Sequence, residues 1–203
     1  MNKLLILISI ILAFTANAHA GIMVVEPDDF ADGQDISNPM LGVALQLESG
    51  LPVYAYDTLE PDYASTGTKV FGYDAGFGVE PYWDDANVFR ATFSALSKYV
   101  AIDVVNNDGQ GSDNAFMEVF GSGGLLTTIY SSTIDFPGFQ TLSFRSESAE
   151  ISYIRMSSSD GSDFNLDRLQ FEVPEPSTLA LMGIGALGFS VRRKKAGSPR
   201  IDG

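Results

Sequence analysis

The chain has 203 residues, of which 45% are hydrophobic, a size that suits one globular domain with accessory segments. It contains no cysteine, which excludes thiol catalysis, and its one histidine, His19, lies in a segment that we expect to be removed. The exported chain would then lack the parts for Ser-His-Asp hydrolysis and for ordinary zinc sites built from Cys and His. The formal net charge of −14 also argues against nucleic acid as a partner, because phosphate binding requires a basic face.

Residues 1–20 have the build of a secretory signal peptide. Lys3 supplies the basic start, an apolar run follows it, and the small-residue sequence Ala18-His19-Ala20 precedes the predicted cleavage point. An uncleaved membrane anchor is the alternative, although the apolar run is short for a span. We therefore expect an exported chain that starts at Gly21 and has lost its only histidine.

The segment 21–173 shows the periodicity of short β-strands. Apolar and polar residues alternate at 41–47, 89–93, 100–104 and 115–119, and each run ends in Gly, Asn, Asp or Ser. Further strands are predicted at 22–26, 53–57, 68–73, 125–131, 140–145, 150–156 and 164–172. This spacing predicts an all-β fold, an antiparallel β-sandwich with jelly-roll topology, flanked by an N-terminal signal helix and a C-terminal transmembrane helix. An irregular β-barrel is the alternative.

The same segment is more acidic than the whole chain. It holds six of the 12 bases and 24 of the 26 acids, which gives a formal charge of −18. A domain without cysteine in an oxidising compartment has to be stabilised by packing or by bound ions.

The C-terminal part combines a Pro-Glu-Pro motif, an apolar segment and a basic cluster. Pro174, Glu175 and Pro176 precede the apolar residues 178–191, and these are followed by Arg192, Arg193, Lys194 and Lys195. As a helix, the apolar segment covers about 21 Å of a hydrocarbon core that is about 30 Å thick, so the predicted transmembrane helix is short. Because the basic residues should stay cytoplasmic, the domain is expected on the outer side of that membrane.

This order of motif, Gly-rich apolar helix and basic cluster resembles the PEP-CTERM sorting signal of exported bacterial proteins. In that family a membrane-embedded exosortase recognises the motif and removes the tail. The resemblance implies a Gram-negative host that makes exopolysaccharide, an inner-membrane-tethered intermediate facing the periplasm, and a final place at the cell surface or in the extracellular matrix. It divides the chain into a signal peptide (1–20), a β-sandwich domain (21–173), a sorting signal (174–195) and a cytoplasmic tail (196–203).

The second half of the domain carries a further resemblance. The segments 101–109, 116–126, 151–155 and 165–171 are similar to jelly-roll domains of other PEP-CTERM proteins, which look like galactose-binding and carbohydrate-binding-module sandwiches. Such modules often hold a structural calcium ion between an Asp of the closing strand and acids near the first strand. The resemblance implies Asp167 as one ligand. The acids near the first strand are Glu26, Asp28, Asp29, Asp32 and Asp35.

Calcium is also reasonable from the residues themselves, because the ion takes six to eight oxygen ligands. Two regions, 26–35 and 106–114, supply carboxylate and amide oxygens densely, and neither follows the EF-hand pattern. We predict a structural Ca²⁺ site whose ligands include Glu26, Asp28, Asp32 and Asp167. The alternative is that Asn, Asp and Gly form turns there, since they tolerate left-handed backbone.

Sugar recognition would need exposed aromatic rings next to polar groups. Trp83, the only tryptophan, and Tyr82 fall in a predicted loop beside Asp84 and Asp85, so they are candidates for stacking against a ligand. The alternative is that these rings cover the edge of the core.

The residues favour a non-enzymatic exported protein, and the resemblance to the PEP-CTERM signal implies exosortase processing and association with exopolysaccharide. A purely structural acidic envelope protein is one alternative. A glycan-active enzyme that uses two carboxylates is another, and it would require a cleft lined by two acids, at least one of them desolvated.

Overall fold

The computed structural model describes residues 21–76, 78–107 and 115–173 of the chain. Residues 22–173 form one compact unit. The predicted signal helix, the transmembrane helix with Pro174–Pro176 and Arg192–Lys195, and most of the 106–114 cluster lie outside the described residues. Within the described part, no helix has the length and apolar character needed to span a membrane.

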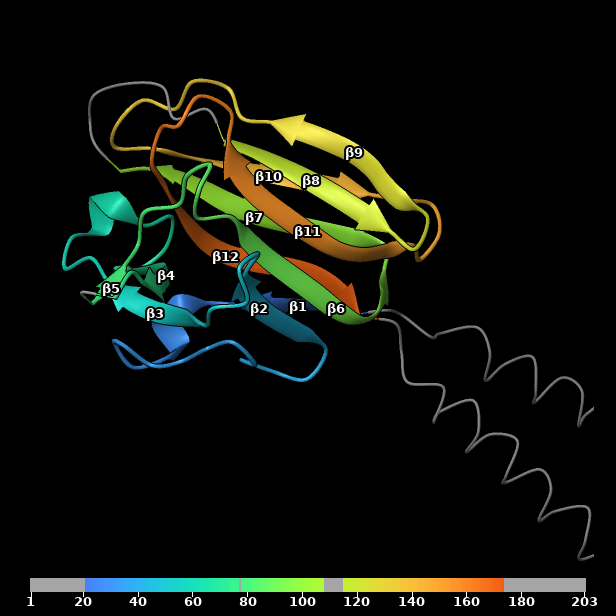
Figure 1. Cartoon of the computed structure of the whole chain (residues 1–203), viewed down its shortest axis with the longest axis horizontal. Coiled ribbons are helices and arrows are strands. Elements are labelled where there is room, and N and C mark those ends of the chain that lie inside the picture. The colour runs from blue at the N-terminus through green and yellow to red at the C-terminus, as the bar shows by residue number, and fades with distance from the viewer. Residues whose placement is uncertain (1–20, 77, 108–114, 174–203) are drawn as a thin grey trace, which may run out of the picture. The chain divides into compact units, whose positions relative to one another are not determined.

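Two antiparallel sheets face each other, which confirms the prediction of an all-β sandwich (Figure 1). One has the order β10-β7-β12-β4-β3, with β1 paired to β12 and β5 to β4. Its strands are β1 Gly21–Val25, β3 Val53–Asp57, β4 Lys69–Asp74, β5 Val79–Glu80, β7 Tyr99–Asn106, β10 Phe139–Arg145 and β12 Phe164–Val173. The other has the order β2-β6-β11-β8-β9. Its strands are β2 Val43–Leu47, β6 Phe89–Ser97, β8 Ala115–Gly121, β9 Gly124–Tyr130 and β11 Ile151–Ser158.

The alternation in the sequence explains which side chains form the core. In β8, for example, Ala115, Met117 and Val119 are buried between the sheets, and the residues between them are half-exposed on the outer face. All the predicted strands are present. The strand β5 was not predicted, because its two residues are too few to show an alternation of apolar and polar residues. Two single-turn 3-10 segments, η1 Pro27–Asp29 and η2 Pro61–Tyr63, interrupt the loops.

Trp83 belongs to the core, so the prediction that its ring stacks against a ligand is wrong. The side chain is fully buried. Its indole Nε1 donates to the carbonyl oxygen of Phe71 at 2.8 Å, and its ring contacts Tyr73 and Phe89. Tyr82, its neighbour, is 44% exposed. Alternation along the chain therefore separates the two aromatic rings, one turned inward and one outward.

The 58–68 loop covers part of the outer face of the seven-stranded sheet, where Asn165 of β12 donates through its side chain to the carbonyl oxygen of Tyr63 at 3.0 Å. The 131–138 loop lies at the end of β7, where Asn106, on the same side of the sheet as the core residue Phe164, donates to the carbonyl oxygen of Ile134 at 2.8 Å. The rings of Tyr63 and Phe136 meet with their centroids 5.2 Å apart, which joins the two loops. Polar residues on the outer face beneath the 58–68 loop are therefore buried.

A bulge in β12 decides which of its residues point outward. Asp167 pairs with Asp103 and Gln170 with Ala101, so β12 has one more residue than β7 over this stretch. Arg168 takes up the excess with a positive φ of 39°. A bulge of this kind reverses the alternation, which lets Leu169 enter the core although it lies three residues after the buried Leu166.

Candidate functional site

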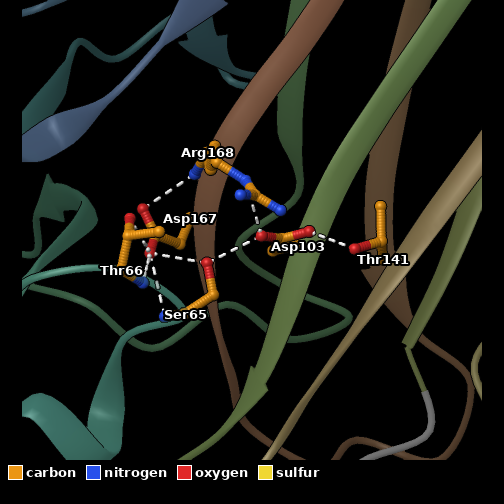
Figure 2. Close-up of polar contacts among 6 residues, drawn as sticks. All are labelled: Ser65, Thr66, Asp103, Thr141, Asp167 and Arg168. Carbon is orange, nitrogen blue, oxygen red and sulfur yellow. Dashed lines mark hydrogen bonds and ion pairs between the residues drawn. The ribbon is translucent and has the colours of Figure 1, made fainter.

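Asp167 and Asp103 are cross-strand partners on the covered face, and both carboxylates are fully buried (Figure 2). Like charges placed opposite each other on neighbouring strands destabilise a sheet unless other groups compensate them. Ser65, in the covering loop, lies between the two: its hydroxyl is 2.7 Å from Asp103 Oδ2 and 2.9 Å from Asp167 Oδ2. One loop side chain therefore links the two buried acids.

Each of these acids has further partners. Asp167 Oδ2 accepts from the backbone N–H groups of Ser65 and Thr66 at 2.9 and 3.0 Å, and Oδ1 accepts from that of Arg168 at 2.7 Å. Asp103 accepts from the Thr141 hydroxyl at 2.6 Å, and its Oδ2 lies 3.0 Å from Nε of Arg168. The bulge thus supplies the cation that neutralises Asp103.

Glu26 and Asp28 extend this acidic cluster along the loop that precedes β2. Asp28 Oδ1 accepts from the backbone N–H groups of Thr68 and Lys69 at 3.2 and 3.3 Å. Its Oδ2 and the Oε1 of Glu26 are buried and have no hydrogen-bond partner. Gly67, at φ +53°, leaves the room that the Asp28 carboxylate occupies, since a Cβ there would lie 2.1 Å from Oδ2. Buried carboxylate oxygens without a partner are costly, so this arrangement favours a bound proton or cation.

The pKa of Glu26 agrees with the burial of these unpartnered carboxylate oxygens. Burial, followed by the nearby charge of Asp167, raises the pKa of Glu26 from 4.5 to about 7. Burial also raises the pKa of Asp167, although its hydrogen bonds from Ser65, Thr66 and Arg168 oppose the shift. A carboxylate pair in contact therefore resists ionisation until a positive charge compensates it.

The predicted calcium ligands are brought together in part. Glu26 and Asp167 interact directly, and Asp28 is close enough to raise the pKa of Glu26 as well. Asp32 has a partner of its own, since its Oδ1 accepts from the backbone N–H of Asp57 at 2.9 Å. As the side chains stand, no group of three or more acids in the described residues has the arrangement of a metal site. The donor chemistry nevertheless fits a hard cation, because two buried carboxylate oxygens remain without partners.

Sequence reasoning missed the residues that complete the cluster, which are Ser65, Thr66, Gly67, Asp103, Thr141 and Arg168. One signal was available, since Asp103 interrupts an otherwise apolar run between Ile102 and Val104. The contribution of the 58–68 loop had no signal, because its contacts join residues about 100 positions apart.

The outer face of the five-stranded sheet, toward the viewer in Figure 1, differs from the covered face. Its side chains form three rows that cross the strands. One row is apolar and aromatic: Ala44, Thr92, Tyr153, Phe120 and Leu125. The middle row is polar: Gln46, Arg90, Arg155, Glu118 and Thr128. The third contains Ser157, Phe116 and Tyr130. Neighbouring rows are about 7 Å apart, since each is displaced by two residues along the strands.

The charges in the middle row are paired. Arg155 lies 3.1 Å from Glu118 and 3.5 Å from Glu48, and Arg90 lies 3.3 Å from Glu48. The Arg90 guanidinium also stands 3.9 Å from the centroid of the Tyr153 ring. Four ionised side chains on this face therefore sum to zero net charge, within a domain of −18.

Aromatic rings on either side of the charged row are also ordered. Phe120 and Tyr153 stack with centroids 4.4 Å apart and an interplanar angle of 7°. On the other side, the rings of Phe116 and Tyr130 are tilted at a centroid separation of 5.7 Å. The face thus alternates apolar, polar and apolar strips along the strand direction. We call this surface the open face.

A shallow groove of about 470 Å³ adjoins the open face at β2 and β6. Its lining is mainly apolar and includes Met40, Leu41, Ala44, Thr92 and Phe93. Ala44 and Thr92 also belong to the first row of the open face. No acidic residue lines this groove, so it lacks the two carboxylates that glycoside hydrolysis uses.

Comparison with known sequences identifies one segment. The PEP-CTERM protein-sorting motif matches residues 172–194, in agreement with the sequence prediction. This motif implies export and processing by exosortase. It starts within the last two residues of β12, so the sorting signal follows the sandwich directly. Curated protein sequences give no match to the chain.

Several solved structures resemble the sandwich. The K2 cleaved adhesin domain of Lys-gingipain is 12% identical, with a TM-score of 0.47 over 75% of this chain and 100% of its own. The carbohydrate-binding module TmCBM61, solved with β-1,4-galactotriose, is 13% identical, with a TM-score of 0.41 over 64% of this chain and 88% of its own. A family 35 carbohydrate-binding module from Clostridium thermocellum is 13% identical, with a TM-score of 0.41 over 75% and 98%. These values describe a likeness of fold only.

Proposed function

We propose that the exported domain is a non-catalytic glycan-binding module that associates with exopolysaccharide through the open face. The observation that carries this proposal is the order of the three rows, with an aromatic strip on each side of a charge-balanced polar strip. Sugars present apolar C–H faces and hydroxyl groups. A chain laid along the strands would meet aromatic surface, then guanidinium, carboxylate and amide groups, and then aromatic surface again.

The sorting motif supports the same proposal from another direction. The motif implies export, and its resemblance to the sorting signals of exopolysaccharide-producing bacteria makes exopolysaccharide a reasonable partner. The open face is covered only at Ser157, which is buried and donates to the carbonyl oxygen of Asp84, and its other two rows are accessible (Figure 1).

The test is native affinity electrophoresis of residues 21–173 in gels that contain purified exopolysaccharide from the host or neutral xylan, galactan and glucan. We expect at least one polymer to retard the domain. Tyr153→Ala should abolish the retardation, because it removes the ring between Phe120 and Arg90. Tyr99→Ala is a matched control. The Arg145 guanidinium lies 4.5 Å from the centroid of the Tyr99 ring, as Arg90 lies over Tyr153, but Tyr99 belongs to β7 in the other sheet. Equal loss in both variants, or no retardation by any polymer, would overturn the proposal.

We also propose that the acidic cluster binds a structural Ca²⁺. Glu26, Asp28 and Asp167 are the side chains that would hold it, after small rotations that bring the unpartnered oxygens toward one point. The ion would supply the positive charge that three neighbouring carboxylates need. It would also tie the η1 segment to β12.

Thermal unfolding with calcium and with EGTA tests this second proposal. We expect calcium to raise the unfolding midpoint of the wild-type domain and to leave that of Glu26→Gln unchanged. Asp32→Asn is the control, because Asp32 is bound to the backbone of Asp57 and should not affect the ion. A wild-type midpoint that does not respond to either reagent excludes the site.

A further inference from the structure

Among the described residues, no strand pairs with the outer edge of β9, and the composition of this strand is unusual. β9 ends the strand order of the five-stranded sheet and pairs with β8. Its segment Gly124–Tyr130 contains no charged residue and no proline. Leu125 and Tyr130 are 52% and 64% exposed. Proteins commonly protect such edges with charges, prolines or a covering segment, because an exposed apolar edge pairs with other strands.

Two other edges of this sandwich are covered by the chain itself. Along β2, the backbone N–H groups of Leu45 and Leu47 donate to the carbonyl oxygens of Ser37 and Leu51 at 2.8 and 2.9 Å. Along β3, Val53 and Ala55 exchange backbone hydrogen bonds with residues 33–36. Within the described residues, therefore, β2 and β3 have backbone partners on both sides. β9 differs from them in this respect.

The charge distribution is also unusual around β9. Sixteen consecutive residues between Glu118 and Asp135 are uncharged, in a domain with a formal charge of −18. Two such domains repel each other over most of their surfaces. The repulsion is weakest where the contact surface carries no charge, so β9 is a favourable place for two copies to meet.

The sequence of β9 is nearly the same in both directions. Leu125-Leu126-Thr127-Thr128-Ile129-Tyr130 has two apolar residues, two threonines and two apolar residues. In an isologous antiparallel pair, each residue meets its counterpart from the opposite end of the strand. Thr127 pairs with the buried Val119 and Thr128 with the outward Glu118, so the two threonines point to opposite sides of the sheet and the two-fold axis passes through one residue pair. With Thr128 on the axis, Thr128 faces Thr128, Thr127 faces Ile129 and Leu126 faces Tyr130, which are favourable cross-strand pairs. The irregularity of register with β8 lies at the Leu125 end, so residues 127–130 form a regular ladder for this contact.

From these observations we propose that β9 pairs with β9 of a second copy of this chain and joins the two five-stranded sheets into one. An antiparallel two-fold pair in a continuous sheet has its axis perpendicular to the sheet. The two open faces therefore lie on the same side of the dimer. If the proposed function holds, one polysaccharide chain can contact both faces, which increases the avidity of binding. The pairing itself does not depend on glycan binding.

Sedimentation velocity of residues 21–173 over a range of protein concentrations tests the association. A single strand pair is smaller than the interface of about 1,200–2,000 Å² that stable complexes bury, so we expect a concentration-dependent dimer. Leu125→Glu should yield a monomer at every concentration. Leu51→Glu adds the same charge at a site of similar exposure, 47%, away from β9, and should dimerise like the wild type. A thermal unfolding curve for each variant verifies that the fold is retained.

Cysteine cross-linking tests the register, because the natural chain contains no cysteine. Thr128→Cys places thiols of the two copies near the two-fold axis, and mild oxidation should produce a disulfide-linked dimer. Leu51→Cys should remain monomeric. An equimolar mixture of Leu126→Glu and Tyr130→Lys should recover dimerisation, because the introduced charges oppose each other across the pair. A wild-type domain that stays monomeric at all concentrations, with no cross-linking of Thr128→Cys above the control, overturns the proposal, and glycan retardation would still report on the open face separately.

Discussion

The two outer faces of the sandwich contain similar residue types but use them differently. On the covered face, Asp103, Asp167 and Arg168 lie beneath the 58–68 loop, and the two acids are fully buried. On the open face, Glu118 and Arg155 are paired at the surface, where water still reaches them. Burial makes the first set indispensable for stability, whereas solvation leaves the second set available for a ligand.

This contrast predicts a large effect for Asp103→Ala. The change leaves the Arg168 guanidinium without its partner and the Ser65 and Thr141 hydroxyls without an acceptor. Breaking a buried pair in this way costs about 3–5 kcal/mol. Urea unfolding should show this loss. Glu118→Ala, which breaks a surface pair of the same kind, should cost less than about 1 kcal/mol. Equal losses would mean that the two faces are solvated alike.

A smaller loss is expected for Gly67→Ala. The new Cβ would clash with the Asp28 carboxylate and the residue would be held at φ +53°, so we expect destabilisation of about 2 kcal/mol and weaker calcium binding. Gly33→Ala is the control, since its φ is +70° and no atom lies within 4 Å of the added Cβ. This control should cost about 1 kcal/mol, and calcium should stabilise it as it does the wild type. If both changes affect stability and calcium binding equally, Asp28 is not a ligand of the metal.

The stability of the calcium-free domain should depend on pH through Glu26. The pKa of this group is about 7 in the folded protein and 4.5 as its ordinary value, so the folded state binds the extra proton between these limits. Stability is therefore highest below pH 4.5 and falls as the pH rises through 7. Solvent screening at this half-buried site limits the change to about 1–2 kcal/mol. Unfolding midpoints in EGTA at pH 5 and pH 8 measure it.

Two comparisons make this pH dependence specific. Glu26→Gln should flatten it, because the amide does not titrate in this range. Calcium should reduce it in the wild type, because a bound cation favours the ionised carboxylate. A slope that survives Glu26→Gln would assign the titration to another group, such as Asp167.

The local pattern of the sequence was sufficient to predict the strands and the sandwich, because the period-two alternation reports which side of a strand is buried. It also placed Glu26, Asp28 and Asp167 in one group, through the resemblance to other sandwiches. It was wrong for Trp83, which is buried, and it did not predict the contact between Asp32 and β3, because both residues lie in loops. Asp32 binds the backbone of β3, and Trp83 turns into the core to donate to Phe71. Loop placement is set by tertiary contacts that a local pattern does not contain.

The open face shows a second limit of prediction from the sequence, which concerns strand order. Arg90, Phe120 and Tyr153 each occupy an outward position that alternation predicts, but they belong to strands that are far apart in the sequence. Only the strand order β6-β11-β8 brings them together in two neighbouring rows of the open face. The sequence predicts that each residue points outward, but it does not predict which residues become neighbours, because the register between strands is a property of the assembled sheet.

The smallest stability effect is expected for Arg155→Gln, on the open face. The change removes two surface ion pairs, with Glu48 and Glu118, and keeps a planar amide near the same place, so the loss should stay below about 1 kcal/mol. Its effect on glycan retardation should be large, because Arg155 is the only member of the middle row that contacts both glutamates in the described structure, and Glu118 would lose its cation while Glu48 kept only Arg90. Arg145→Gln is the matched control, since Arg145 pairs with Glu172 in the other sheet. A variant that unfolds like the wild type but no longer binds polysaccharide would establish that the charges of the open face serve recognition, whereas unchanged retardation would restrict binding to the aromatic rows.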